Sequence, residues 1–99
     1  MQGHYPPAFE REMGCTEAEL RGWLPGGSRD RHIDWRDRGA DIALDGGQVS
    51  IDWQPLDPRR IGLIVLPRLH VGFAVEHVDA AAWQRFMRYF DLSTQRGGG

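Results

Sequence analysis

The sequence predicts an α+β domain in which a mainly antiparallel sheet of four or five strands, built from two hairpins, has two helices packed on one face. Three observations predict it. The segment 59–77 is strongly apolar with strand periodicity, 41–54 alternates around a glycine pair, and helix signatures occur in two segments outside these hairpins. The 99 residues form one domain, because a chain of this length has no room for a second core.

Composition favours a cytoplasmic protein. A net charge of −2 provides no general attraction to nucleic acid or to an anionic membrane. Cys15 has no partner for an intrachain disulfide, which favours a reducing compartment. The first residues lack the charge and apolar run of a signal peptide, and the apolar run 61–66 is too short to span a bilayer. We therefore expect neither nucleic acid nor a membrane as partner.

The N-terminal residues predict a loose lead-in followed by an edge strand. Pro6 and Pro7 forbid a helix in residues 1–7. Residues 8–13 then alternate apolar or basic positions with glutamates, as in a short edge strand.

The first helix has a clear start signal. Thr16 is a natural N-cap, and Glu19 three residues later completes a capping box. Cys15 and Leu20 occupy the two positions of a hydrophobic staple around that box. The Pro-Gly-Gly run at 25–27 ends the helix.

The segments that follow predict a loop and then a hairpin. Residues 28–39 are rich in Arg and Asp, so we expect a solvated loop anchored by Trp35, with a strand beginning near its end. In 41–54 a turn at Gly46-Gly47 places Leu44, Ile42 and Ala40 on the same face as Val49, Ile51 and Trp53. A turn at Asp45-Gly46 preserves the same parity, so the apolar face does not depend on this choice.

Two geometries fit the central segment 59–77. A continuous strand over 61–75 would be roughly 50 Å long at 3.3 Å per residue. A domain of this size has a radius of gyration near 13 Å. We therefore prefer a second hairpin with its corner at Pro67 and Arg68.

In that hairpin Ile64 and Leu66 join Val71 in the core, and the alternate residues project outward. An apolar strip set in polar surroundings is typical of a partner surface. Cover by the lead-in or by the 28–39 loop is the competing explanation. The predicted interface comprises Ile61, Leu63 and Val65.

The chain ends with a predicted helix and a tail. Asp79 is the candidate N-cap, and the alanines at 80–82 are strong helix formers. The aromatic and methionine positions recur at helical spacing and predict a core stripe: Trp83, Phe86, Met87 and Phe90. Residues 95–99 have nothing to bury and are expected to be loose.

We assign no catalytic residue, metal ligand or cofactor. The four histidines and Cys15 lack the paired spacing of zinc sites. Cys15 before a helix could be a nucleophile, but its staple role and two nearby glutamates favour a structural thiol. Asp41 and Asp52 could face each other across the hairpin, an arrangement that on a solvated face usually gives mild repulsion.

Basic residues provide the candidate site for a small anionic ligand. Guanidinium groups bind anions through a planar fork of donors. The candidate ligand-binding residues are Arg59, Arg60, Arg68 and His70. With Arg68 at the hairpin corner, the other two arginines would lie at the far end of the strand and form a separate site. Solvated surface charge is the alternative interpretation.

Three segments carry a family resemblance: CTEAELRGWLP, RRIGLIVLPRL and FMRYFDLSTQRGGG. Together they resemble an uncharacterised family of short bacterial proteins of about this length. The resemblance implies no activity, cofactor or catalytic residue.

The leading functional prediction is a small non-catalytic interaction module that self-associates through the outer face of the central hairpin. Its partner would be a second copy or another protein. The second prediction is a protein that binds a small ligand or anion through an arginine. A small enzyme ranks third, because no set of nucleophile, base and orienting group can be assembled at plausible spacing.

Overall fold

The computed structural model describes residues 4–95, which form an antiparallel sheet and two helices. In chain order the elements are β1 (Ala8–Met13), α1 (Glu17–Gly27), β2 (Ile33–Arg36), β3 (Gly39–Leu44), β4 (Gly47–Ile61), β5 (Ile64–Glu76) and α2 (Ala80–Gln95). The five strands lie in the order β1-β5-β4-β3-β2, with every neighbouring pair antiparallel. The predicted α+β class is confirmed.

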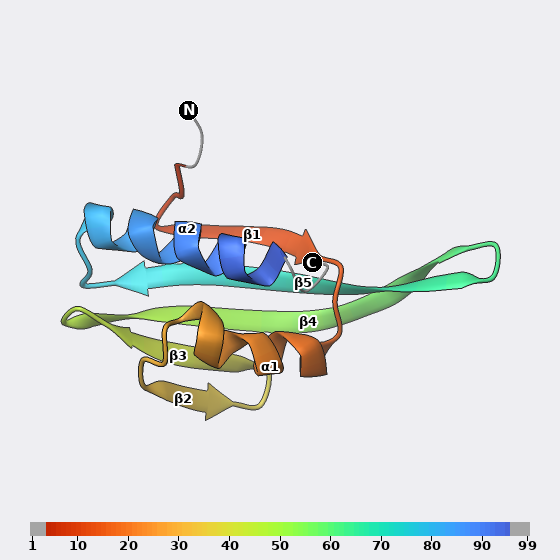
Figure 1. Cartoon of the computed structure of the whole chain (residues 1–99), viewed down its shortest axis with the longest axis horizontal. Coiled ribbons are helices and arrows are strands. Elements are labelled where there is room, and N and C mark those ends of the chain that lie inside the picture. The colour runs from red at the N-terminus through yellow and green to blue at the C-terminus, as the bar shows by residue number, and fades with distance from the viewer. Residues whose placement is uncertain (1–3, 96–99) are drawn as a thin grey trace.

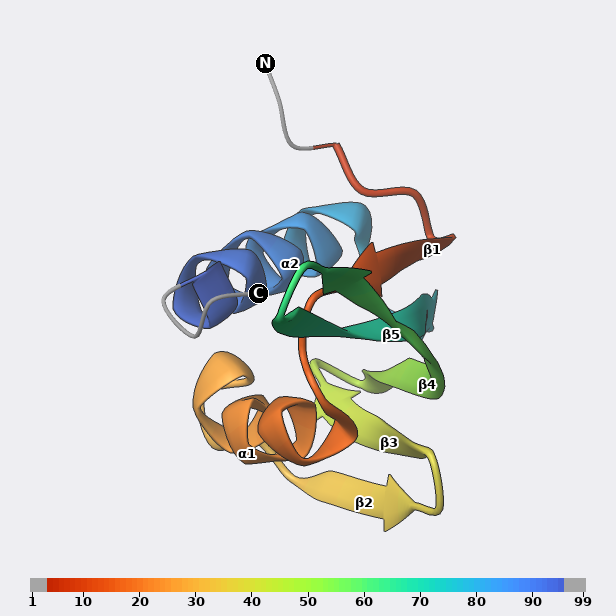
Figure 2. The same ribbon diagram turned by 90° about the vertical axis from the view of Figure 1, so that its right-hand side faces the viewer.

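The helices cover one face of the sheet and leave the other bare (Figures 1 and 2). Helix α2 lies along β1 and β5, whereas α1 lies over the half formed by β3 and β4. The helix side carries the large apolar residues of the strands, with Arg11 of β1 among them as a charged residue that contacts Asp91 of α2. Because successive strand residues point to opposite faces, the alternating sequence is enough to build this two-layer arrangement.

The hairpin of β3 and β4 buries the face that the sequence predicts. Val49, Ile51 and Trp53 are at most 3% exposed, as are Leu69 and Val71 on β5. The turn lies at Asp45 and Gly46, the second of the two predicted positions. Both residues have positive φ (40° and 87°), as a type I′ turn requires.

Helix α1 starts as predicted. The Thr16 hydroxyl accepts a hydrogen bond from the Glu19 amide at 3.0 Å, and the Glu19 carboxylate accepts one from the Thr16 amide at 2.9 Å. Cys15 and Leu20 are both fully buried, as the hydrophobic staple demands.

Helix α2 is capped by Asp79, whose carboxylate accepts a hydrogen bond from the Ala82 amide at 2.8 Å. Its aromatic stripe is core, as predicted. Phe90 packs edge-on against Phe73 of β5, and Trp83 stacks on Phe86.

The N-terminal lead-in is held in place from Tyr5 onward, in contrast to the expected loose segment. The Tyr5 backbone exchanges hydrogen bonds with the Gln84 side chain at 2.7 and 2.8 Å, and the Pro6 carbonyl accepts one from the Trp83 indole. The Tyr5 hydroxyl also donates to Asp91. Of the predicted loose tail, Gln95 ends α2 and residues 96–99 lie outside the described range.

The segment 28–39 contains an edge strand, β2, where we expected mainly loop. Trp35 is not a buried anchor, since 44% of its surface is exposed. The guanidinium of Arg21 instead lies over both the Trp35 and Trp53 rings, 5.4 and 5.1 Å from their centroids. Trp35 therefore covers an arginine rather than entering the core.

The predicted hairpin corner at Pro67 and Arg68 is wrong. The chain turns at Gly62 and Leu63, and Gly62 has φ 59°, which suits the first central position of a type II′ turn. Ile64 pairs with Ile61 and is 57% exposed, so it does not join the core beside Val71.

The length argument failed because β5 leaves the body of the protein. Its 13 residues span about 40 Å at 3.3 Å per residue. The last regular pair on the body side is Leu56 with Arg68, and a bulge then sets two residues of β4 against Pro67. We call residues 57–67, which extend beyond this pair, the arm, and the remaining residues the body.

Candidate functional site

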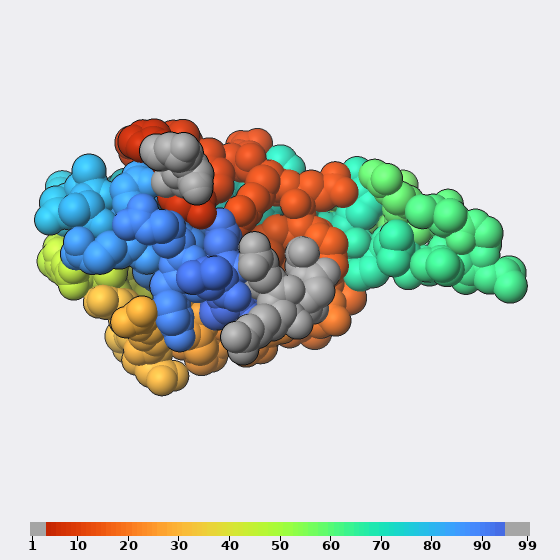
Figure 3. Space-filling model, turned by 45° about the horizontal axis from the view of Figure 1, so that its top comes forward, coloured from red at the N-terminus to blue at the C-terminus, as the bar shows by residue number. Residues whose placement is uncertain are grey.

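The arm carries a dense group of exposed apolar side chains. In Figure 3 it projects from the body. The exposed fractions are 55% for Ile61, 101% for Leu63, 57% for Ile64, 52% for Val65 and 42% for Leu66. Soluble monomers rarely expose so contiguous an apolar patch without a binding role. The arm is therefore the candidate functional site.

Strand register divides these side chains between the two sides of the arm. Paired residues project to the same side, and neighbours along a strand alternate. Ile61 pairs with Ile64, so these two share a side with Leu66, whereas Val65 pairs with Arg60 on the opposite side. The predicted strip of Ile61, Leu63 and Val65 thus spans both sides and the turn. The more apolar side is that of Ile61, Ile64 and Leu66.

Prolines occupy the base of the arm. Within residues 4–95, β3 pairs with β4 as far as Asp52 and β1 pairs with β5 as far as Leu69, so both arm edges lack a neighbouring strand. Pro58 lies six residues beyond the limit on β4 and Pro67 two residues beyond that on β5, and neither has an N–H to donate. Proline on an edge strand opposes pairing with a further strand. The arm base is consequently suited to contact through side chains rather than through its backbone.

The arm has no layer beneath it to bury its side chains. The body buries its strands under α1 and α2, but neither helix extends over the arm (Figure 1). A two-stranded hairpin without such cover is marginally stable in water. The arm therefore combines a weak local fold with an apolar surface.

Arg68 and His70, two of the predicted anion-binding residues, already have acidic partners on β1. The Arg68 guanidinium donates to both Glu12 carboxylate oxygens at 3.0 Å, and His70 Nε2 lies 3.1 Å from Glu10 Oε1. The pKa of Glu12 is lowered, and the main cause is the hydrogen bond from Arg68. A free anion would have to displace these carboxylates.

Arg59 and Arg60 belong to the arm and take no part in the contacts of Arg68 with Glu12 or of His70 with Glu10. As neighbours on one strand they point to opposite sides, with Arg59 opposite Leu66 and Arg60 opposite Val65. The positive charge of Arg59 contributes to lowering the pKa of Glu12. The structure does not bring the four predicted residues together in one empty site. Anion binding by these residues stays a prediction.

Arg36 joins the two aspartates of the bare sheet face. It donates to both carboxylate oxygens of Asp41 at 2.9 and 3.1 Å and to Asp52 at 2.5 Å. This contact lowers the pKa of Asp41 chiefly through the Arg36 hydrogen bond. Carboxylates held by a guanidinium in this way are poorly suited to acid–base exchange. They act here as a charge network across the sheet.

The Cys15 thiol is not set up as a nucleophile. Burial raises its pKa to about 11, and the negative charge of Glu19 acts in the same direction. Reactive cysteines need a lowered pKa and access to solvent. Cys15 serves as the apolar half of the staple.

A second site escaped the sequence analysis: a small pocket between the α1–β2 loop and α2, where Arg29, Arg31 and Arg85 gather. These arginines come from segments more than fifty residues apart, so no local motif joins them. The one signal was the arginine pair flanking Asp30, which we interpreted as part of a solvated loop.

Other chemistry finds little support in the described residues. Within residues 4–95, no three side chains of the His, Cys, Asp or Glu type lie close enough together to hold a metal ion. Neither α1 nor α2 is long and apolar enough to cross a membrane.

Comparison with known proteins adds no family assignment. No protein-family model matches the chain, and a search of curated proteins found no match. The functional interpretation therefore depends on the geometry of the arm and of the arginine pocket.

Proposed function

We propose that the protein is a small interaction module that forms a homodimer by packing the arm of one copy against the arm of another. The observation that carries the proposal is the exposure of five large apolar side chains on a hairpin without cover. Fully burying one such side chain contributes about 1.5–3 kcal/mol. A second arm would supply the missing layer.

The more apolar side of the arm defines the contact. Ile61, Ile64 and Leu66 share this side, and a two-fold axis would bring the same three residues of each copy together. Arg59 lies on this side nearer the body. In an antiparallel arrangement it would meet the partner's tip, so the two arginines would be kept apart.

Face-to-face packing is favoured over edge-to-edge strand pairing. Pro58 and Pro67 remove backbone donors at the base of the arm, and the bulge there interrupts a regular ladder. Side-chain contact needs no free backbone donor. The proposal therefore predicts no strand pairing between the two copies.

The test uses charge substitutions and sedimentation. Ile64→Glu and Ile61→Glu should convert a wild-type dimer to a monomer, because a carboxylate in the contact would lose its water. Circular dichroism of both variants should match that of the wild type, since neither side chain is buried in the body.

Leu92→Glu is the matched control. Leu92 is 64% exposed on α2, away from the arm, so this variant should remain dimeric. A wild type that sediments as a monomer at its highest soluble concentration would overturn the proposal. So would dissociation of the Leu92→Glu control to the same extent as the Ile64→Glu variant.

A further inference from the structure

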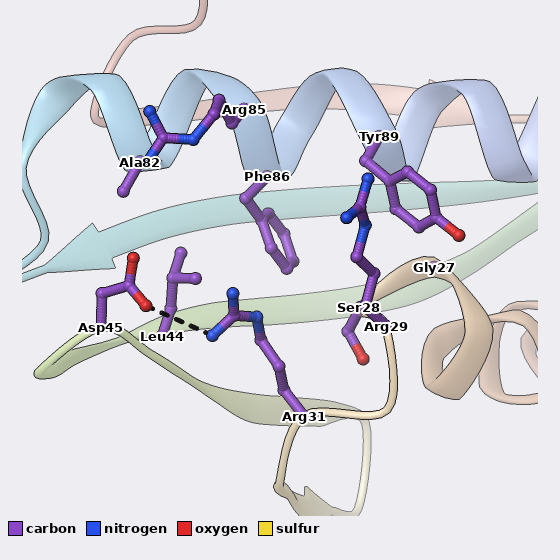
Figure 4. Close-up of a pocket in the computed structure, with 10 residues that line it drawn as sticks. All are labelled: Gly27, Ser28, Arg29, Arg31, Leu44, Asp45, Ala82, Arg85, Phe86 and Tyr89. Atoms are coloured by element: carbon purple, nitrogen blue, oxygen red, sulfur yellow. Dashed lines mark hydrogen bonds and ion pairs between the residues drawn. The ribbon is translucent and has the colours of Figure 1, made fainter.

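The pocket between the α1–β2 loop and α2 lies at the end of β4 opposite the arm. It has a volume of about 130 Å³ and opens between the loop, the β3–β4 turn and α2 (Figure 4). The residues that matter for its chemistry are Arg29, Arg31, Asp45, Arg85, Phe86 and Tyr89.

The end of α1 places the loop against α2. The Asp30 amide donates to the Pro25 carbonyl at 2.7 Å, and the Arg29 amide donates to the Gly26 carbonyl at 3.1 Å. This is the Schellman pattern, which reverses the chain after a helix. Gly27 permits the close approach, because a Cβ there would lie 3.1 Å from a ring carbon of Phe90.

Arg29 occupies a backbone position that usually belongs to glycine. Its φ of 59° is left-handed, as the residue after the helix cap must be in this motif. A side chain kept at a position where glycine is less strained suggests a role for that side chain. Its guanidinium carbon lies 4.0 Å from the centroid of the Tyr89 ring, and Figure 4 shows the two groups side by side. Tyr89 thus holds the Arg29 side chain at the pocket.

Positive charge at the pocket exceeds negative charge. Three guanidinium groups line it with one carboxylate, that of Asp45, which is 3.4 Å from Arg31. Within residues 4–95, neither Arg29 nor Arg85 has a carboxylate at ion-pair distance. Arg36 and Arg68, by contrast, each bind a carboxylate through two nitrogens.

We propose that this pocket binds a small dianion of the phosphate class, either inorganic phosphate or the phosphoryl group of a small phosphomonoester. Two guanidinium forks from the α1–β2 loop and one from α2 suit an acceptor with oxygens in several directions, which a phosphoryl group has and a carboxylate lacks. The pocket, with a volume of about 130 Å³, has room for one such group.

Calorimetric titration with inorganic phosphate and with phenyl phosphate tests the proposal, with chloride at matched ionic strength as the reference. The wild type should bind phosphate at millimolar concentration or below. Arg85→Gln should weaken binding about tenfold or more, because a hydrogen bond to a charged group is lost. Arg88→Gln, on the same helix but outside the pocket, should bind as the wild type does.

Two further variants separate a binding role from a structural one. Arg29→Gly should weaken binding about tenfold while leaving the melting temperature equal or higher, because glycine relieves the left-handed strain. Asp45→Asn should tighten binding, since it removes the carboxylate that competes for Arg31. Asparagine also tolerates the positive φ of this turn position.

The relative affinities of the two probes identify the source of the phosphoryl group. Tighter binding of phenyl phosphate would indicate an organic phosphomonoester that also contacts the aromatic side chains, and tighter binding of phosphate would indicate the free ion. No heat from either probe would overturn the proposal. Equal weakening by Arg88→Gln would also overturn it, since that would be non-specific charge attraction.

Discussion

The two long strands β4 and β5 pass through two regions with opposite surroundings. In the body, their apolar residues alternate with polar ones and lie beneath α1 and α2, where Leu69 is 1% exposed. In the arm, apolar residues follow one another without interruption from Ile64 to Leu66, and all are exposed. In a strand that is buried on one face, apolar and polar residues alternate. A strand with apolar surroundings on both faces does not require this alternation.

The comparison shows that apolar content does not by itself distinguish core from interface. Both regions contain branched apolar side chains in the same two strands. What differs is whether a further layer covers them, and the prolines at 58 and 67 mark the boundary. An apolar strand segment beyond such a boundary is better interpreted as a contact surface than as core.

The sharpest test of the comparison replaces two leucines three residues apart on β5. Leu69→Ala should lower the free energy of unfolding by about 2–5 kcal/mol, because it opens a cavity in the body. Leu66→Ala should change it by less than about 0.5 kcal/mol when the protein is dilute enough to be monomeric, because Leu66 is exposed. Urea unfolding at low protein concentration measures both. Similar losses for the two variants would mean that the arm is packed in the monomer.

Capping of α1 should have the next largest effect. Thr16→Ala should lower the free energy of unfolding by about 0.5–2 kcal/mol, because the Glu19 amide loses its acceptor. Thr16→Ser and Thr16→Asp keep an acceptor and should be nearly neutral. Denaturant melts distinguish these outcomes, and equal losses in all three variants would contradict the cap.

Alkaline pH should weaken the body and leave the arm unaffected. Burial raises the pKa of Cys15 from 9.0 to about 11, and burial with the Asp91 hydrogen bond raises that of Tyr5 from 10.0 to about 12. The unfolded chain therefore loses these protons first, so stability is complete below pH 9 and declines gradually between pH 9 and 12. The arm contains neither cysteine nor tyrosine.

The double variant Cys15→Ala, Tyr5→Phe is the control for this pH dependence. Its unfolding free energy should be lower at neutral pH but flatter between pH 9 and 12 than that of the wild type. Thermal melts across this range provide the measurement. A wild-type stability that rises toward pH 12 would contradict the proposed proton linkage.

Deletion of the whole arm should have only a small effect on the body. Replacing residues 57–67 with Asn-Gly would join Leu56 to Arg68 through a two-residue turn. The body keeps the strands beneath α1 and α2 and loses Pro58 and Pro67, which line a hollow with Thr16 at the start of α1. Its free energy of unfolding should therefore change by less than about 1 kcal/mol. Hydrogen exchange of the body amides provides a second measurement. General loss of protection would show that the arm is required for the body to fold.

The elements that the sequence predicted correctly are those determined by local chemistry. The capping box at Thr16 and Glu19 needs only neighbouring residues, and so does the cap at Asp79. The apolar face of β3 and β4 was predictable because either turn position preserves the strand parity. The turn itself proved to be Asp45-Gly46.

The arm turn and the arginine pocket depend on information that is not local. The turn at Gly62 was missed, because we placed the corner at Pro67 and Arg68 on a size limit that holds only for strands confined to the body. The pocket forms because Gly27 lets α1 approach α2, a tertiary contact that joins Arg29 to Arg85. No spacing of residues along the sequence indicates that contact.

The buried Cys15 can report on local opening at the start of α1. Because it is the single cysteine of the sequence and fully buried with a raised pKa, a thiol-alkylating reagent can modify it only when the start of α1 opens. The labelling rate at low reagent concentration then measures the free energy of that local opening without a probe being attached. Following this rate with and without phosphate, or above and below the dimerisation concentration, would show whether either binding event tightens this junction.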